Sequence, residues 1–532
     1  MKLTTILAIL AAVGSAGTMM ISTCLAQTPT TTPTTMPRHP VSSPYGINNW
    51  DFGPREVQMM KDTGVRWARV MVAWNSVEPK EGQFDWKGLD EAVKNLDAAG
   101  MAIDFSYHNV PGWSYMPGGT GLAAPEKMAR FVGLCAARYK GKVDAHEIYN
   151  EDICGIWPHV AERSAQKYVP TLQACYKAVK EVEPRQMVLA GGLWQFPMYY
   201  LEDMYKAGAK GYFDALNFHF YISAIPGGPA AVDAFRGDYA FPLYYLRAVS
   251  RKYNDVKPIW VTEVGWSIST ENQAHPVSLE DQAKYLQYAY RTTMETGMVD
   301  KVFWYVFYMQ DGMSLIHRND TSAKFGPAAA ADFKRPAYKA MCDFIAKYPK
   351  WDASLAKPLP IPAPASKPAT IVNAGFESEG GWTLPAGAQR VETAQEGKYA
   401  LQLVSTGTDT VRAEGTAFAV EPSKCYEVRG WAKISGGWEK AQTGHVMWEI
   451  EFFNESGKRL DMVGPLHDNR PGEQLSTNYY VNETFGQWQE LHYPVIVPEE
   501  ARTARLAARV GLHPGTALFD AVSFTPLDVR PK

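Results

Sequence analysis

The chain has 532 residues, with 53 basic and 56 acidic side chains and a formal net charge of -3. This balance excludes the strongly basic surface that nucleic-acid binding requires. Charged residues make up 20% and hydrophobic residues 46% of the sequence, a composition that excludes a mostly disordered protein. Aromatic residues reach 12%. This surplus either fills hydrophobic cores or lines a surface that binds flat apolar faces, such as those of sugar rings.

The N-terminal residues are typical of an export signal. Lys2 supplies a positive charge, residues 3–20 form an apolar run of mostly small side chains, and residues 23–27 read as a cleavage region. A membrane anchor is the alternative, although small and polar residues dilute the run. We predict that residues 1–26 are a signal peptide and that the mature protein is secreted, periplasmic or extracellular, without stable membrane insertion. Lipidation of Cys24 is a further alternative, which the threonine before it fits poorly.

The cysteines outside the signal are odd in number and show no CxxC or zinc-like spacing. One or two disulfides in an oxidising compartment and a set of buried thiols are both compatible with this pattern. The five positions are Cys135, Cys154, Cys175, Cys342 and Cys425.

Two proline-rich segments divide the chain. Residues 27–40 form a Thr/Pro-rich linker, and residues 357–368 form a second linker, whose alternating prolines exclude a helix or a central strand. We therefore expect one domain over residues 41–356 and another over residues 369–532.

In residues 41–356, short apolar runs alternate with longer helical patterns, as in a (β/α)8 TIM barrel. A doubly wound sheet is the alternative, but it requires a Gly-rich turn that does not follow Asn48. The predicted strands are 45–48, 67–73, 102–107, 145–150, 188–191, 215–219, 259–263 and 302–305. The predicted helices are 54–63, 89–99, 125–139, 165–182, 199–207, 242–253, 279–296 and 336–347.

The remaining residues predict an all-β jelly-roll sandwich, because short strand patterns are separated by Gly, Pro, Asn and Asp turns and no long helical pattern occurs. The predicted strands are 391–403, 418–434, 446–453, 488–497, 505–512 and 517–525.

Carboxylates stand at the ends of two barrel strands. Asn150 and Glu151 end the fourth strand, and Glu263 ends the seventh. A helix cap or a rim ion pair explains one such glutamate, but two on opposite sides of the barrel mouth are a rarer pattern. Active sites of this fold lie at the carboxyl ends of the strands. Paired carboxylates across a cleft are what glycosidic bond cleavage needs.

These residues resemble the signature of the clan A glycoside hydrolases, which place both catalytic carboxylates on strands four and seven. Residues 66–70, 74–79 and 82–86 are similar to the second-strand region of glycoside hydrolase family 39. The resemblance covers about residues 45–348 and implies a (β/α)8 barrel and a mechanism that retains anomeric configuration.

The resemblance also assigns roles to individual residues. Glu151 matches the general acid/base and Glu263 the nucleophile. Asn150 would hydrogen-bond the sugar 2-hydroxyl, and Arg69 would keep Glu263 ionised by charge pairing. Tyr149 departs from the pattern, because many members have Trp there, and this weakens the assignment to the family.

Other polar residues at strand ends are candidates for substrate binding. His219 and Tyr221 follow strand six, where the clan often places a group hydrogen-bonded to the nucleophile. His108 and Asn109 follow strand three. A structural role is the alternative for each, and for Asp104, inside strand three, the structural role is preferred.

Aromatic residues at the same face are candidates for platforms that stack on sugar rings, with Trp304 expected as the floor beneath the sugar next to the two glutamates. The alternative for each one is a place in the core. The set comprises Trp50, Trp74, Trp113, Tyr115, Trp194, Trp266 and Trp304.

The C-terminal part resembles carbohydrate-binding-module β-sandwiches, in residues 372–377 with Trp382 and in residues 518–524. The resemblance implies that Glu377 and Asp520 help to hold a structural Ca²⁺, although two side chains do not complete a site of six to eight ligands. The domain either binds glycan or only supports the barrel. A binding platform or the sandwich core accounts equally well for Trp431, Trp438, Trp448 and Trp488.

Together these observations predict a secreted retaining glycoside hydrolase that needs no cofactor for catalysis and acts within a polysaccharide. Endo-acting relatives of family 39 that cut bacterial exopolysaccharide resemble this layout most. The alternatives are an exo-acting glycosidase such as a xylosidase, a transglycosylase with the same residues, and a non-catalytic glycan-binding protein. Because both glutamates are present, the non-catalytic alternative is disfavoured.

Overall fold

The computed structural model describes most of the chain from Ser43 onward. The predicted signal peptide, the first linker, Cys154 and Trp438 lie outside the described residues. Across the described part, none of the helices combines the length and apolar character needed to cross a membrane. The described ranges are 43–117, 121–151, 165–194, 198–221, 232–269, 276–309, 312–317, 333–351, 353–356, 361–407, 410–435, 445–460, 475–479, 486–511 and 514–530.

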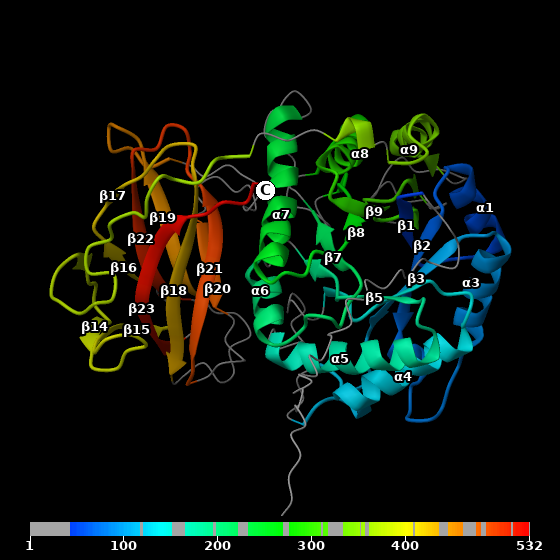
Figure 1. The fold of residues 1–532 in the computed structure, drawn as a ribbon, viewed down its shortest axis with the longest axis horizontal. Coiled ribbons are helices and arrows are strands. Elements are labelled where there is room, and N and C mark those ends of the chain that lie inside the picture. Colours follow the sequence, from blue (N-terminus) through cyan, green and yellow to red (C-terminus); the bar gives the residue numbers. More distant parts are fainter. Residues whose placement is uncertain are drawn as a thin grey trace, which may run out of the picture. The chain divides into compact units, whose positions relative to one another are not determined.

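The first part of the described chain is a (β/α)8 barrel, as the sequence predicts (Figure 1). Its parallel strands run in the order β5-β4-β3-β2-β1-β9-β8-β7-β6. A bridge from Leu189 to Ala215 joins β5 to the start of β7, so β5 and β6 share one barrel position and the sheet closes. The strands are β1 (Tyr45–Asn49), β2 (Trp67–Ala73), β3 (Ala102–His108), β4 (Ala145–Glu147), β5 (Met187–Leu189), β6 (Leu193–Trp194), β7 (Leu216–Phe220), β8 (Ile259–Val264) and β9 (Val299–Trp304).

Helices follow the strands along the chain. Proline opens α1, α4 and α9, where its missing N–H removes no helical hydrogen bond. Helix α7 begins earlier than predicted, because Pro242 lies inside the helix rather than at its start. The helices are α1 (Pro54–Asp62), α2 (Trp74–Val77), α3 (Lys87–Ala98), α4 (Pro125–Arg138), α5 (Ala165–Val182), α6 (Met198–Lys206), α7 (Val232–Lys252), α8 (Leu279–Thr296) and α9 (Pro336–Lys347).

Short elements supplement the barrel. Two 3₁₀ turns, η1 (Gly112–Ser114) and η4 (Ala353–Leu355), lie between its helices or after them. A three-stranded sheet follows β9 and consists of β10 (Tyr308–Met309), β11 (Ile316–His317) and β12 (Phe333–Lys334).

Large aromatic side chains fill the inside of the barrel. The rings of Trp67 and Trp260 meet edge to face with centroids 5.0 Å apart, and Phe303 stacks on Trp260 at 6.0 Å. All three are fully buried. Gly46 on β1 lets the Phe303 ring approach the backbone, because a Cβ at this position would lie 2.3 Å from a ring carbon.

The C-terminal part consists of two antiparallel sheets (Figure 1). One is β13-β16-β22-β19-β20, with β17 paired to β22, and the other is β14-β15-β23-β18-β21. The strands are β13 (Trp382–Thr383), β14 (Ala388–Val391), β15 (Ala400–Thr406), β16 (Val411–Gly415), β17 (Phe418–Ala419), β18 (Cys425–Ser435), β19 (His445–Phe453), β20 (Leu475–Tyr479), β21 (Trp488–Ile496), β22 (Thr503–Gly511) and β23 (Pro514–Pro526).

Two predicted strands of this part are divided in the structure. Residues 391–403 form a hairpin of β14 and β15 rather than one strand, and residues 418–434 divide into β17 and β18. The sequence marks both breaks: residues 392–399 are mostly polar and include Gly397, and Pro422 lies between β17 and β18. The core includes Trp448, Ile450 and Phe452 from β19, together with Phe519 and Phe524 from β23.

The four described cysteines are free thiols, which favours the buried-thiol alternative for these positions. Burial raises the pKa of the thiols of Cys135, Cys175 and Cys425, so they are poor nucleophiles at neutral pH.

Replacing Gly46 with alanine tests the packing inside the barrel. The added Cβ meets the Phe303 ring, so we expect Gly46→Ala to lower the free energy of unfolding by about 1–3 kcal/mol. Gly88→Ala in α3 is the matched control, because no atom lies within 4 Å of its new Cβ. The control should be neutral or slightly stabilising. Equal urea midpoints for the two variants would contradict this description of the core.

Candidate active site

The centre of the site is the guanidinium of Arg69, which lies on β2 and has no exposed surface. It donates to both carboxylate oxygens of Glu147, at 2.8 and 2.6 Å, and to Oε1 of Glu263 at 2.6 Å. A buried ion is tolerated only when its charge is paired and its hydrogen bonds are satisfied. Burial opposes the charged form of Arg69, but the two glutamates raise its pKa and keep it ionised.

Three neutral groups complete the surroundings of Arg69. Its Nη1 donates to Oδ1 of Asn48 at 2.9 Å, and its Nη2 donates to Oγ of Ser106 at 2.8 Å and to Oδ1 of Asn150 at 2.7 Å. Asn48 donates in turn to the backbone oxygen of Thr262 at 2.8 Å. Arg69 therefore connects the carboxyl ends of strands β1, β3, β4 and β8.

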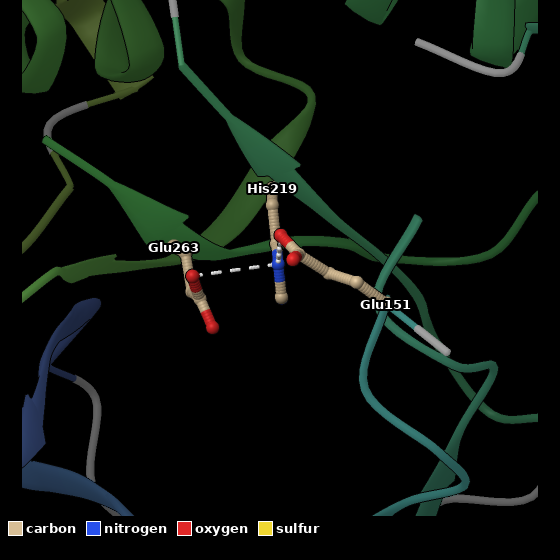
Figure 2. Close-up of side chains that lie close together, drawn as sticks. All are labelled: Glu151, His219 and Glu263. Atoms are coloured by element: carbon tan, nitrogen blue, oxygen red, sulfur yellow. Dashed lines mark hydrogen bonds and ion pairs between the residues drawn. The ribbon is translucent and has the colours of Figure 1, made fainter. Parts of the chain in front are cut away.

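His219 lies between the two predicted catalytic glutamates (Figure 2). Its Nδ1 is 2.6 Å from Oε1 of Glu151 and 3.5 Å from Oε2 of Glu263. The hydroxyl of Tyr221 donates to Oε2 of Glu263 at 2.5 Å. One side-chain atom of each of His219, Glu151 and Glu263 lies within 4.8 Å of the others. The structure thus brings together polar residues that the sequence places at strands two, four, six and seven. They are Arg69, Glu151, His219, Tyr221 and Glu263, and Asn150 is held next to them by its hydrogen bond from Arg69.

Burial and neighbouring charges change the pKa values of Glu151 and His219. Burial raises the pKa of Glu151, and the charge of Glu263 adds to this, although His219 and Arg69 act in the opposite direction. Burial alone would lower the pKa of His219, yet the negative charges of Glu263 and Glu151 raise it to about 9. Glu151 therefore retains a proton at higher pH than an ordinary glutamate, while Glu263 stands between two cations, Arg69 and His219.

Local backbone geometry brings these side chains to one place. Strand β4 ends at Glu147, and Tyr149 then adopts a left-handed conformation with φ +67°. This turn returns Asn150 and Glu151 toward the strand end, where a continuing strand would carry them away. On the other side, a bulge shifts the register of β7 against β8 so that His219 pairs with Glu263. Bulges of this kind redirect side chains next to active sites.

Sequence reasoning did not assign Glu147, Asn48 and Ser106 to the site. The argument that identified Glu151 applies equally to Glu147, because Glu147 is also a charged residue at the end of a buried strand. Asn48 and Ser106 carry no such signal, because neutral polar residues inside strands are common. Asp104, expected to be structural, is fully buried beside Arg69 in the strand register, and burial raises the pKa of its carboxyl.

One part of the predicted rim is accessible. Trp50 is 48% exposed, and its ring lies edge-on to His108 at 5.8 Å. Nε2 of His108 is buried and has no hydrogen-bond partner among the described residues. Burial and the charge of Arg69 lower the pKa of His108 to about 4, so its ring is neutral. Asn109 beside it is exposed, with φ +50°.

Three of the predicted aromatic platforms are inaccessible. Trp74, Trp266 and Trp304 have no exposed surface, so the expectation that they stack directly on sugar does not fit the structure. Trp74 stacks on Phe131 at 4.8 Å, and Nε1 of Trp304 donates to the backbone of Met313. The hydroxyl of the partly exposed Tyr221 contacts Glu263, and the partly exposed ring of Tyr305 lies beside Tyr221 with centroids 6.3 Å apart.

The other aromatic candidates differ in their surroundings. Trp113 is half-buried, donates to the backbone oxygen of Glu78, and has Lys127 and Arg130 next to its ring. Tyr115 is half-buried. The side chain of Trp194 lies outside the described residues. In the sandwich, Trp448 is a core residue, whereas Trp431 and Trp488 are half-buried.

Two groups of carboxylate-containing side chains are candidates for holding a metal ion. The atoms of Glu151, His219 and Glu263 are close enough for a metal ion, but Arg69 and Tyr221 already donate to the two oxygens of Glu263. In the sandwich, Oε1 of Glu377 accepts the backbone N–H groups of Lys398 and Tyr399, and the Asp520 carboxylate accepts three backbone N–H groups. In both groups carboxylate oxygens already accept hydrogen bonds, and a structural Ca²⁺ at Glu377 and Asp520 stays a prediction.

Two family models match segments of the chain. The model described as Beta-galactosidase of the family Glyco_hydro_42 matches residues 48–115, and the model described as Glycosyl hydrolase catalytic core matches residues 157–326. A curated relative, Beta-galactosidase BbgII of Bifidobacterium bifidum, is 32% identical over 65 residues. The match covers 12% of this chain and 9% of the relative, so the chain spans less than a tenth of that protein. Sequence features of glycoside hydrolase catalytic domains therefore extend over much of the barrel.

Several solved structures are similar to the chain. A family 39 glycoside hydrolase of Bacteroides cellulosilyticus WH2 is 16% identical with a TM-score of 0.43, covering 87% of this chain and 81% of that one. A GH5_18 protein of Streptomyces cattleya in complex with GlcNAc is 14% identical with a TM-score of 0.45, covering 60% and 82%. An exo-beta-1,4-mannosidase of Opitutaceae bacterium strain TAV5 has a TM-score of 0.41 at 14% identity, covering 57% and 59%.

Replacing Glu147 tests the charge pairing around Arg69. Glu147→Ala removes one of the two carboxylates that Arg69 contacts directly and leaves a buried positive charge under-compensated. We expect a loss of about 3–5 kcal/mol in the free energy of unfolding. Glu81→Ala, at an exposed position, is the control and should change it by less than about 0.5 kcal/mol. An effect of Glu147→Ala as small as that of the control would show that Glu147 does not neutralise Arg69.

Proposed function

We propose that the protein is a retaining glycoside hydrolase with Glu263 as nucleophile and Glu151 as general acid/base. The observation that carries this proposal is the Glu151–His219–Glu263 arrangement, in which carboxylate oxygens of the two glutamates lie within 4.8 Å. Retaining enzymes hold their carboxyl groups about 5–5.5 Å apart, whereas inverting enzymes leave roughly 6.5–9.5 Å for a water molecule. The short separation therefore supports retention.

In the first step, the Glu263 carboxylate attacks the anomeric carbon and the bond to the leaving oxygen breaks. Glu151 transfers its proton to that oxygen, so the leaving group departs as an alcohol. Arg69 and Tyr221 contact the two oxygens of Glu263 and orient it for attack. Oδ1 of Asn150 is held by Arg69, which fixes the amide for a hydrogen bond to the sugar 2-hydroxyl.

In the second step, Glu151 accepts a proton from water, and the resulting hydroxide displaces Glu263 from the anomeric carbon. The product keeps the original anomeric configuration because two inversions have occurred. His219, at 2.6 Å from Glu151, provides positive charge that stabilises the Glu151 carboxylate between the two steps. The same pair of steps with a sugar alcohol in place of water gives transglycosylation.

We further propose that the enzyme is exported and acts within a polysaccharide. Accessible aromatic rings at separate strand ends, Trp50 after β1 and Tyr305 after β9, support more than one sugar subsite. The β-sandwich also suits a polymeric substrate. An exo-acting enzyme such as a xylosidase is the second candidate. Export stays a prediction, and so does a structural calcium at Glu377 and Asp520.

Substitution of the two glutamates tests the mechanism. With a panel of polysaccharides and aryl glycosides, Glu263→Ala should reduce hydrolysis below detection, because no nucleophile remains. Glu151→Ala should lower the rate by roughly 10²–10⁴-fold on substrates with poor leaving groups. Added azide should restore turnover to Glu151→Ala and yield a glycosyl azide of retained configuration, because azide displaces Glu263 from the glycosyl-enzyme. Glu81→Ala serves as the control for handling and folding. Wild-type activity in Glu263→Ala, or a product of inverted configuration, would contradict the proposal.

A further inference from the structure

Tyr149 joins the segment that carries Glu151 to a different loop of the barrel mouth. Its side chain is fully buried, and its hydroxyl accepts the backbone N–H of Ala123 at 2.8 Å. Ala123 lies opposite Tyr115 in a short antiparallel ladder, whose hydrogen bonds are made by the residues on either side of this pair. The N–H of Ala123 therefore points away from the ladder. One tyrosine hydroxyl thus connects the loop after β3 with the turn after β4.

The backbone at Tyr149 is held in a conformation that a residue other than glycine rarely adopts. Its φ is +67°, a left-handed value that costs free energy and persists only where the surroundings impose it. The hydroxyl of Tyr168 donates to the backbone oxygen of Ile148 at 3.2 Å, and the N–H of Gly192 donates to the backbone oxygen of Tyr149 at 3.4 Å. Together with the bond from Ala123, these contacts hold the turn through its backbone and its side chain.

The hydroxyl is the part of Tyr149 that another aromatic residue would not replace. Many members of the family that the sequence resembles have Trp at this position, and an indole N–H donates a hydrogen bond but cannot accept one. Phenylalanine does neither. Either residue would leave the buried N–H of Ala123 without the acceptor that it has in this structure, and an unsatisfied buried backbone group is costly.

Asn150 and Glu151 follow Tyr149 directly, so the turn decides where both side chains begin. Asn150 accepts a hydrogen bond from Arg69, and Glu151 lies 2.6 Å from His219. We infer that Tyr149 is a positioning residue for Glu151, which aims the proposed acid/base at the leaving oxygen and ties its place to the loop after β3. This inference rests on the proposed function, because it concerns how the acid/base is placed.

Tyr149→Phe removes the hydroxyl and keeps the ring, and its effect should depend on the leaving group. The probes are aryl glycosides of a sugar that the wild-type chain hydrolyses. With a poor leaving group, which needs a proton from Glu151, kcat/KM should fall roughly tenfold, because a misplaced general acid contributes less. With dinitrophenol, which leaves without that proton, kcat/KM should stay within about twofold of wild type. A loss of folded protein would lower both values equally.

Tyr45→Phe is the matched control. Tyr45 is equally buried, and its hydroxyl donates to the backbone oxygen of Tyr348 at 2.6 Å, at the start of β1 rather than at the carboxyl ends of the strands. This variant should keep the wild-type kcat/KM for both leaving groups. Tyr149→Phe added to Glu151→Ala should cause no further loss, because a residue that acts through Glu151 then has nothing to position.

The pH profile of kcat/KM gives a second readout. Burial raises the pKa of Glu151, with Glu263, His219 and Arg69 as the charged groups around it. A Glu151 that is less firmly held becomes better solvated, its pKa falls, and it loses its proton at lower pH. The basic limb of the profile should therefore move to lower pH in Tyr149→Phe and stay in place in Tyr45→Phe.

The inference is overturned if Tyr149→Phe lowers kcat/KM equally for both leaving groups, if it behaves like Tyr45→Phe, or if its effect adds in full to that of Glu151→Ala. Should Tyr149→Phe fail to fold, Tyr168→Phe decides in its place, because it loosens the same turn at Ile148 and should show the same dependence on the leaving group. If Glu151→Ala itself shows no such dependence, the proposed role of Glu151 fails and the inference falls with it.

Discussion

The guanidinium of Arg69 has no exposed surface, and removing an ion from water costs several kcal/mol unless partners of opposite charge compensate. Glu147 and Glu263 provide that compensation through direct hydrogen bonds. Because these partners come from β4 and β8, the electrostatic requirement also links opposite sides of the barrel mouth. The position of Glu263, the proposed nucleophile, is in this way tied to the stability of the fold, and a further hydrogen bond from Arg69 holds Asn150.

This charge pairing distinguishes the surroundings of the two glutamates that we propose as catalytic. Glu263 is bonded to Arg69, whereas Glu151 has no bond to it and is dominated by burial, which raises its pKa. His219 contacts both residues and couples their protonation. A carboxylate paired with a buried cation and a neighbouring carboxyl whose pKa is raised by burial are a suitable combination for double displacement. The division of roles follows from the surroundings, since the two side chains are chemically identical.

The barrel, its strand ends and the residues Glu151, Glu263, Arg69, His219 and Tyr221 could be predicted from the sequence, because apolar periodicity places the strands and polar residues at their ends are unusual. Glu147 was not assigned, since only the left-handed turn at Tyr149 brings both Glu147 and Glu151 to the same site. The sequence pattern places the start of α7 too late, because a proline inside a helix resembles the proline that often opens one.

The aromatic surplus was the least predictable feature. A tryptophan at a strand end can stack on a sugar or fill the space between strand and helix, and its sequence position is the same in both cases. Trp67, Trp74, Trp260, Trp266, Trp304 and Trp448 are fully buried, so much of the surplus fills cores. Burial depends on neighbours distant in sequence, such as Phe131 against Trp74, and no local pattern encodes it. At the predicted rim Trp50 is 48% exposed, whereas Trp113, Tyr115 and Tyr305 are half-buried.

The protonation of Glu151 tests the central claim most directly. In protein labelled with ¹³C at the glutamate carboxyl carbon, the resonance that disappears in Glu151→Gln identifies this residue. The account predicts that it titrates above the usual range of a glutamate, because burial and the charge of Glu263 raise its pKa. Titration at or below the usual value, roughly 4.3, would show that Glu151 holds no proton near neutral pH and would contradict its role as the general acid.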